Sequence, residues 1–206
     1  NMLPTAQFAY LDELFNGPGS VLNATLNILN EREFSSGGKT VQCPLITGVA
    51  TTNKVSDNPE LSALVDRFLI MRQVHPADSE GARRNVLKAF IEADSITEVK
   101  FPDTLSMSDL TLLQNAIRRV KIPEYLANML ESVRTQYVNS GAGVFVSDRR
   151  FCWAYRAMQA SILMATGGQY TEHPPMDATT IIADVLTRRP GDYSMLETAI
   201  AQQFQV

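Results

Sequence analysis

The sequence predicts an α/β unit built around a parallel sheet, followed by an all-α unit. Two observations support this fold class. Between residues 8 and 74, short apolar runs and amphipathic segments alternate in the order strand, helix, strand, helix, strand. After His75 and Pro76, every periodic segment has the spacing of a helix. We therefore expect two units, residues 1–76 and residues 77–206.

Three apolar runs are predicted as the strands of the sheet. Phe8–Leu11 is too short for a helix and is predicted as a buried strand. Pro44–Asn53 contains a second buried strand that ends on polar residues, and Leu69–Val74 is a third. Because helical segments connect the runs, we expect the strands to be parallel.

The segments between the strands carry helix and turn signals. Val21–Asn30 has leucines at helical spacing. Asn58 and Pro59 are a typical N-cap and first helical residue, and the helix that they open is expected to extend to Phe68. Ser35–Gly38 is predicted as a hairpin-type turn between two short extended segments.

The second unit is predicted to be entirely helical. Ser106 and Asp109 form a potential capping box, and Gly167 is a typical helix end. The expected helices are Ser79–Ala93, Ser106–Val120, Pro123–Asn139, Asp148–Thr166, Asp177–Thr187 and Ser194–Phe204.

Composition excludes several classes of protein. The 206 residues are 45% hydrophobic and 19% charged, and no apolar run approaches the length of about 20 residues that spans a bilayer. Cys43 and Cys152 are too few for a disulfide scaffold, so we expect a cytoplasmic protein. The net charge of −4 argues against direct nucleic-acid binding. Because a buried strand comes so soon after Asn1, we expect the sequence to start within a domain.

Two adjacent carboxylates, Asp12 and Glu13, follow the first predicted strand. In parallel α/β folds, residues at the carboxyl ends of strands line the crevice that binds ligands. A nucleotide hydrolase needs an Asp there to hold magnesium and a neighbouring Glu to polarise the attacking water. The alternative is an acidic helix entry or a charged loop.

A second polar group, Thr51, Thr52 and Asn53, ends the second predicted strand. If the two strands are neighbours, Asn53 comes close to Glu13, where an amide can orient a water or contact a phosphate. By itself, Asn at a strand end is also a common turn former.

Arginines form the third group of candidates. Arg67 is a candidate arginine finger, or simply a cation placed favourably at a helix C-terminus. Arg149 and Arg150 lie in the first turn of a helix, where positive charge opposes the helix dipole. A bound phosphate or a salt bridge to a carboxylate would compensate for that charge.

The order of these features resembles the MoxR group of AAA+ ATPases, and within it the RavA subfamily. The family's segment from the loop before the Walker B strand through the next helix is similar to LPTAQFAYLDELFNGPGSVLNATLNILNEREF. Its sensor 2 helix is similar to VSDRRFCWAYRAMQAS. The resemblance covers most of residues 1–190 and implies a partial AAA+ P-loop core followed by a helical lid subdomain.

The resemblance assigns roles at the strand ends. It implies that Asp12 and Glu13 are the Walker B pair, with Asp12 binding magnesium and Glu13 activating water for ATP hydrolysis. It also implies that Asn53 is sensor 1 and positions that water.

The arginines receive roles in the same way. The resemblance implies that Arg67 is the finger acting in trans, and that Arg149 is sensor 2 acting in cis, with Arg150 as the alternative. Glu31 and Arg32 lie where such proteins often make subunit contacts.

A phosphate-binding loop of the form GxxxxGK[ST] is absent from this sequence. The stretch GGKT, Gly37–Thr40, has Glu33 where the earlier glycine is required, and it follows a helix and precedes a strand. It is therefore predicted to be a hairpin tip. We expect the P-loop half to lie upstream of Asn1 or on a separate piece, and this chain alone to be inactive.

The resemblance implies an ATP hydrolase that forms a ring, commonly a hexamer. It would act in chaperone-like remodelling or assembly of protein complexes together with a von Willebrand factor A domain protein. The alternative is an AAA+-like assembly module that does not hydrolyse ATP. A nuclease using Asp12 and Glu13 is disfavoured because the sequence offers no positioned lysine and no basic groove.

Overall fold

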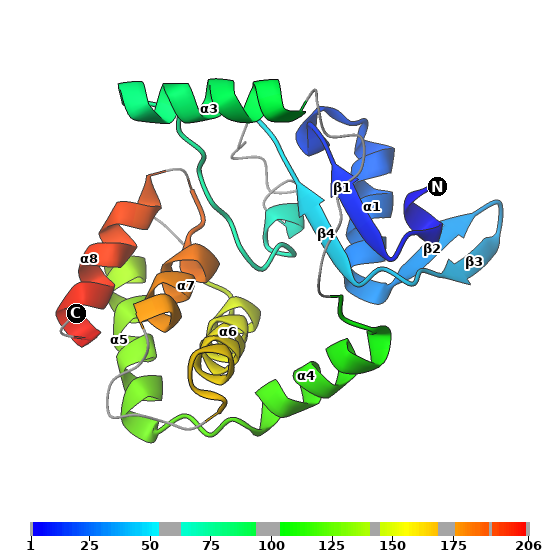
Figure 1. The fold of residues 1–206 in the computed structure, drawn as a ribbon. Coiled ribbons are helices and arrows are strands. Elements are labelled where there is room, and N and C mark those ends of the chain that lie inside the picture. The colour runs from blue at the N-terminus through cyan, green and yellow to red at the C-terminus, as the bar shows by residue number, and fades with distance from the viewer. Residues whose placement is uncertain are drawn as a thin grey trace.

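The structure is a computed structural model that describes residues 2–53, 63–93, 104–140, 145–168, 176–189 and 191–204. It combines a small α/β part with a group of helices, as the sequence predicts. Figure 1 shows the two parts side by side, with the sheet and α1 next to the group formed by α5 to α8.

The sheet contains two parallel strands, β1 (Phe8–Leu11) and β4 (Thr47–Ala50). Phe8 is opposite Thr47 and Leu11 is opposite Ala50, so both strands end at the same level. The chain passes from one strand to the other through helix α1 (Gly19–Glu31) and a hairpin. The prediction of parallel strands is confirmed, and their carboxyl ends lie side by side.

Helix α1 covers one face of this sheet. Ala9 packs against the cluster that contains Ile28, and a Cβ added at Gly48 would lie 3.7 Å from the side chain of Leu29. On the opposite face, Phe8 and Tyr10 are 61% and 64% exposed. The expectation of a fully buried strand is therefore wrong for that face, because no described element packs on it.

The glycine-rich stretch forms the tip of a hairpin. Strands β2 (Glu33–Ser36) and β3 (Lys39–Gln42) are antiparallel, and only Gly37 and Gly38 connect them. Both glycines have positive φ, 59° and 77°, as a type I′ turn requires. The prediction of a hairpin tip is confirmed.

The third predicted strand, Leu69–Val74, is wrong, because these residues have no regular secondary structure. A strand needs a neighbour to satisfy its backbone groups, and β1 and β4 pair only with each other among the described residues. Instead, the N–H of Met71 donates to the carbonyl of Asp184, 3.1 Å away. The helix predicted from Asn58 lies outside the described residues as far as residue 62, and residues 63–65 are helical.

The six helices predicted for the second part are confirmed. Ser106 and Asp109 form the expected capping box, and the hydrogen bonds from Ser106 hold the pKa of the Asp109 carboxyl below its usual value. The helices are α3 (Glu80–Ala93), α4 (Met107–Arg119), α5 (Glu124–Asn139), α6 (Asp148–Thr166), α7 (Met176–Leu186) and α8 (Asp192–Phe204).

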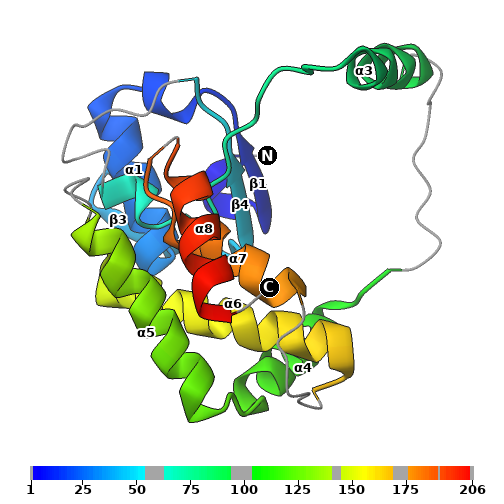
Figure 2. The ribbon, with the colours of Figure 1, turned by 90° about the vertical axis from the view of Figure 1, so that its left-hand side faces the viewer.

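The main hydrophobic core lies among α5 to α8. Leu126, Leu130, Val133 and Tyr137 form the buried face of α5, at the positions expected from their spacing. Helix α3 has no buried residue, and Figure 2 shows it set apart from the other helices. Helix α3 therefore contributes nothing to this core.

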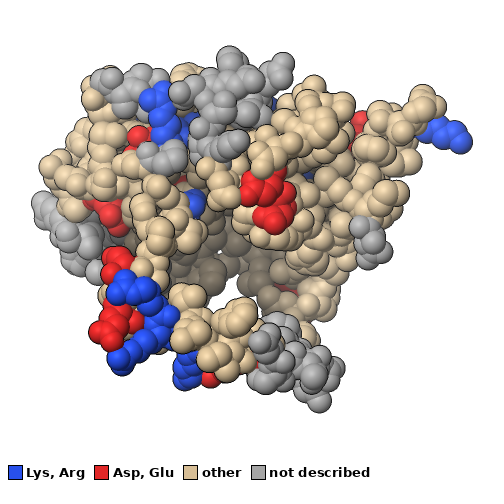
Figure 3. All heavy atoms as spheres, turned by 90° about the horizontal axis from the view of Figure 1, so that it is seen from above, with Lys and Arg blue, Asp and Glu red and all other residues tan. Residues whose placement is uncertain are grey.

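Two surface properties bear on the kind of protein. No helix in the described ranges has the length and apolar character needed to cross a membrane. Figure 3 shows that, on the face seen from above, Lys and Arg lie in small separate groups and form no continuous basic surface.

Candidate active site

The carboxyl ends of β1 and β4 bring the first two groups of candidate residues together. Two backbone hydrogen bonds extend the pairing beyond the strands: Thr51 N–H to the carbonyl of Leu11 (2.9 Å), and Leu14 N–H to the carbonyl of Thr51 (3.0 Å). Asp12 and Glu13 lie between the two positions that these bonds hold. The two polar groups therefore form one site.

Two amides hold the carboxylate of Glu13. Asn53 Nδ2 donates to Oε1, and Asn16 Nδ2 donates to Oε2, each at 2.6 Å. The predicted proximity of Asn53 and Glu13 is confirmed. Sequence reasoning missed Asn16, because its position three residues after Glu13 in the NGPG stretch indicated only a turn.

The backbone of Glu13 is left-handed, with φ 50° and ψ 41°. A non-glycine residue in this region costs of order 1–3 kcal/mol, and such residues are concentrated at functional sites. The Asn16 N–H donates to the Glu13 carbonyl at 2.9 Å, so the turn holds Glu13 by its main chain as well as by its side chain. The strained conformation marks Glu13 as a functional candidate.

One oxygen of Asp12 is held by the protein. Oδ1 accepts hydrogen bonds from Thr51 Oγ1 (2.5 Å) and from the N–H of Glu13 (3.1 Å). Oδ2 has no partner among the residues that the structure describes. Magnesium at nucleotide sites typically takes one or two carboxylates, with phosphate and water completing its shell, and Asp12 fits that requirement. No group of three or more His, Cys, Asp or Glu residues lies together in the described ranges.

A second cluster is centred on Asp66, which lies just after the helical residues 63–65. Four arginines surround its carboxylate, and three of them are the candidates Arg67, Arg149 and Arg150. The ion pairs join Arg188 Nη1 (2.8 Å) and Arg150 Nε (3.3 Å) to Oδ1, and Arg67 Nη1 (3.4 Å) and Arg149 Nη1 (3.9 Å) to Oδ2.

Arg150 is fully buried, at 0% exposed, and its guanidinium hydrogen-bonds to groups inside the protein. Besides Asp66, it donates to the carbonyls of Val65 (3.2 Å), Phe68 (2.9 Å) and Val185. Burial, together with the charge of Arg188, holds the pKa of Arg150 below its usual value. This geometry disfavours Arg150 as a phosphate ligand and confirms the salt-bridge alternative for this residue.

Arg149 and Arg67 keep unused donors. The side chain of Arg149 is 46% exposed, and its guanidinium donates no hydrogen bond to a described residue. Arg67 Nε is buried and has no partner within the described ranges. Sequence reasoning missed Arg188, because its place at the end of α7 indicated only a helix C-terminus.

The comparison with protein families assigns the chain. Residues 1–115, more than half of the 206, match the family described as "MoxR domain in the MoxR-vWA-beta-propeller ternary systems". The chain belongs to this MoxR family. The resemblance to MoxR AAA+ proteins, which the Asp-Glu pair and the following segments indicate, is confirmed at the family level.

Individual proteins are also similar to this MoxR chain. Two relatives from Methanocaldococcus jannaschii, the uncharacterized proteins MJ0079 and MJ0812, are 33% and 31% identical over 157 residues. Those residues are 76% of this chain but only 39% and 40% of the relatives, so the chain spans about two fifths of their length.

A solved structure shares the fold. A "putative ATPase" from Cytophaga hutchinsonii has a TM-score of 0.70 and 20% identity to the MoxR chain, and the match covers 96% of this chain and 66% of that one. At this identity the likeness concerns the fold alone.

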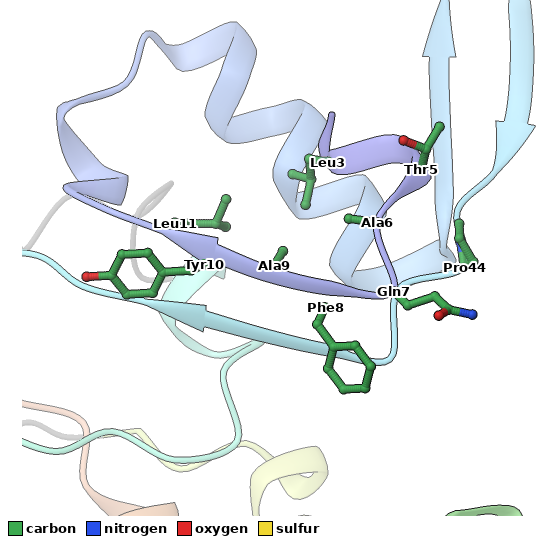
Figure 4. A pocket seen from close by; sticks show the side chains of 9 residues that line it. All are labelled: Leu3, Thr5, Ala6, Gln7, Phe8, Ala9, Tyr10, Leu11 and Pro44. Carbon is green, nitrogen blue, oxygen red and sulfur yellow. The ribbon is translucent and has the colours of Figure 1, made fainter. Parts of the chain in front are cut away.

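Two further features of the MoxR chain lie outside the site. Arg32, at the end of α1, donates to the carbonyls of Ile28 (3.1 Å) and Leu29 (2.5 Å) of its own helix, and its contact with another subunit, like that of Glu31, stays a prediction. A cavity of about 580 Å³ runs along β1, as Figure 4 shows, but none of its lining residues is a candidate site residue.

A buried acid also links the segment after Asp66 to α7. Asp184 Oδ2 is 3.4 Å from Arg72 Nη1, whereas its buried Oδ1 has no partner among the described residues. Burial raises the pKa of Asp184. Because this pKa is raised, the contribution of Asp184 to folding stability is present at low pH, where the carboxyl is protonated. It is lost as pH rises through the pKa of the folded state.

We expect Asp184→Asn to become more stabilising, relative to the unchanged MoxR protein, as pH rises from about 4 to 8, because the variant never carries the buried charge. Unfolding midpoints in denaturant across this pH range measure the difference. Asp78→Asn, which changes an exposed Asp, is the control and should show no such trend. A difference independent of pH would contradict the prediction.

Proposed function

We propose that this chain supplies part of the ATP-hydrolysing site of a MoxR ATPase of the RavA-like type. The observation that supports this function best is the arrangement at the strand ends, where Glu13 is held by Asn53 beside Asp12. It combines a positioned carboxylate, an amide and a second carboxylate whose Oδ2 has no partner among the described residues, and these are among the groups that phosphoryl transfer to water needs.

Each residue at the strand ends has a distinct task in this proposal. Glu13 polarises the attacking water, and Asn53 orients the Glu13 carboxylate and that water. Asp12 binds magnesium through Oδ2, the oxygen to which no described residue donates. Magnesium, when bound, offsets the negative charge of the phosphates.

The two arginines with unused donors stabilise the phosphate charge in this proposal. Arg67 and Arg149 both lie within 4 Å of the same oxygen of Asp66, so the two guanidiniums are close together. We therefore propose that they act on the same phosphate group at one subunit interface. The sequence-based expectation, in which Arg67 acts in trans and Arg149 in cis, is the alternative to this proposal and stays a prediction.

The wider setting is also a proposal. The P-loop would be supplied by another part of the protein, and residues 1–76 and 77–206 would be the end of the α/β subdomain and the helical lid. The family is named for MoxR-vWA-beta-propeller ternary systems, which supports a von Willebrand factor A domain partner. A ring, commonly a hexamer, would then remodel protein complexes in the cytoplasm.

ATP turnover and ATP binding by the full-length protein test this function. We expect Asn53→Ala to lower turnover roughly 10–100-fold, a range typical for partners that orient a reacting group. The matched control, Asn27→Ala, changes an exposed Asn of α1 and should leave turnover unchanged. An unmodified protein that neither binds nor hydrolyses ATP would contradict the proposal and favour the assembly module.

A further inference from the structure

We propose that Asp66 is a positioning residue that holds Arg67 and Arg149 in place of a nucleotide phosphate and releases them when nucleotide binds. This inference rests on the proposed function and extends it. In this inference the Asp66 carboxylate connects the helical part of the chain to Arg67 and Arg149, the two arginines that would contact phosphate.

The two oxygens of Asp66 have different partners. Oδ1 pairs with Arg188 and Arg150 at 2.8 and 3.3 Å, and both of these side chains are at most 12% exposed. Oδ2 pairs with Arg67 and Arg149 at 3.4 and 3.9 Å, and these side chains are more exposed. One oxygen therefore anchors Asp66, and the other makes the weaker contacts that can be exchanged.

Asp66 itself is firmly held. Arg150 ties it to α6 and also donates to the carbonyls of Val65 and Phe68 on either side of it. The hydroxyl of Ser147 is 3.1 Å from Oδ2 and 3.3 Å from Oδ1, and it also accepts the N–H of Arg150 at the start of α6. When the contacts at Oδ2 exchange, the arginines therefore move and Asp66 stays.

The charge balance favours an incoming anion. Within the described residues, the ion pairs of Arg67, Arg149 and Arg150 all go to Asp66. One carboxylate cannot neutralise these charges, so the cluster retains positive charge that attracts phosphate. Arginine binds phosphate through paired N–H donors, which the single long contact of Arg149 to Asp66 leaves available.

This role and a purely structural role predict opposite changes in nucleotide affinity when the charge of Asp66 is removed. If Asp66 only joined the helices to the sheet region, its loss would weaken folding and nucleotide binding together. If Oδ2 competes with phosphate, removing its charge lowers stability but strengthens binding, because Arg149 and Arg67 no longer have to leave a carboxylate.

The test uses the full-length assembled protein, with the binding of AMP-PNP and magnesium and the thermal unfolding midpoint as readouts. We expect Asp66→Asn to lower the midpoint and to bind AMP-PNP about 2- to 5-fold more tightly, the range for exchange of one exposed ion pair. The gain should disappear in Asp66→Asn/Arg149→Gln. Arg188→Gln, which removes an Oδ1 anchor and leaves the contacts of Arg67 and Arg149 with Oδ2 in place, should lower the midpoint without tightening binding.

Each outcome decides between the readings. If Asp66→Asn does not fold, Asp66→Asn/Arg188→Gln removes a cation together with the carboxylate, and the same tighter binding is expected. Unchanged or weaker binding, or a gain that persists without Arg149, would overturn this inference and leave the proposed function standing. No binding by the unmodified protein would overturn the proposed function, and this inference with it.

Discussion

Glu13→Gln abolishes ATP turnover in the full-length protein and leaves nucleotide binding intact, if Glu13 polarises the attacking water. The expected loss is roughly 10²–10⁴-fold, the range for removing a general base. Gln keeps the size of the side chain and can still accept from Asn53, but it cannot take a proton. Turnover rates measured beside AMP-PNP binding separate the two effects.

A matched control for this variant lies in the hairpin. Glu33 also accepts a hydrogen bond from a side-chain amide, that of Gln42 at 2.7 Å, but it lies away from the strand ends. We expect Glu33→Gln to leave turnover unchanged. Normal turnover in Glu13→Gln would exclude Glu13 as the group that activates water.

Arg150→Met should cause the largest loss of stability. The substitution removes the side-chain hydrogen bonds to the carbonyls of Val65, Phe68 and Val185 and weakens the pairing of a largely buried Asp66. Breaking a buried ion pair from one side costs about 3–5 kcal/mol in the free energy of unfolding. Denaturant unfolding of the full-length protein measures this cost.

The neighbouring arginine provides the control for that measurement. Arg149 is half exposed and lies 3.9 Å from the same carboxylate, so Arg149→Gln should cost less than about 1 kcal/mol. Equal costs for the two substitutions would show that Arg150 is no more important for folding than a surface arginine.

Local signals in the sequence were sufficient to predict the helices of the second part. The capping pair Ser106 and Asp109 and the leucine spacing of α5 act over a few residues, so they could be recognised without the rest of the fold. The hairpin at Gly37 and Gly38 was predictable for the same reason. The strand expected at Leu69–Val74 was wrong, because a strand depends on a partner that its own residues do not specify.

In the candidate site, too, some contacts could be predicted from the sequence and others could not. Asp12, Glu13 and Asn53 could be expected to meet, because the ends of neighbouring parallel strands always lie at one edge. The hydrogen bonds from Asn16 and Thr51 were not predictable, since they depend on the turn that places Glu13 in a left-handed conformation.

The sequence by itself determined the helices of the second part, the positions of the first two strands and the family, because these depend on local periodicity and on motifs. Only the tertiary structure shows how the environments of Arg149 and Arg150 differ. Consecutive residues of a helix point about 100° apart, so Arg150 is fully buried against Asp66, whereas Arg149 reaches the same carboxylate from a half-exposed position. Only the tertiary structure also brings Arg188 to Asp66 across 122 positions of the chain, since packing of α7 beside α6 makes that contact.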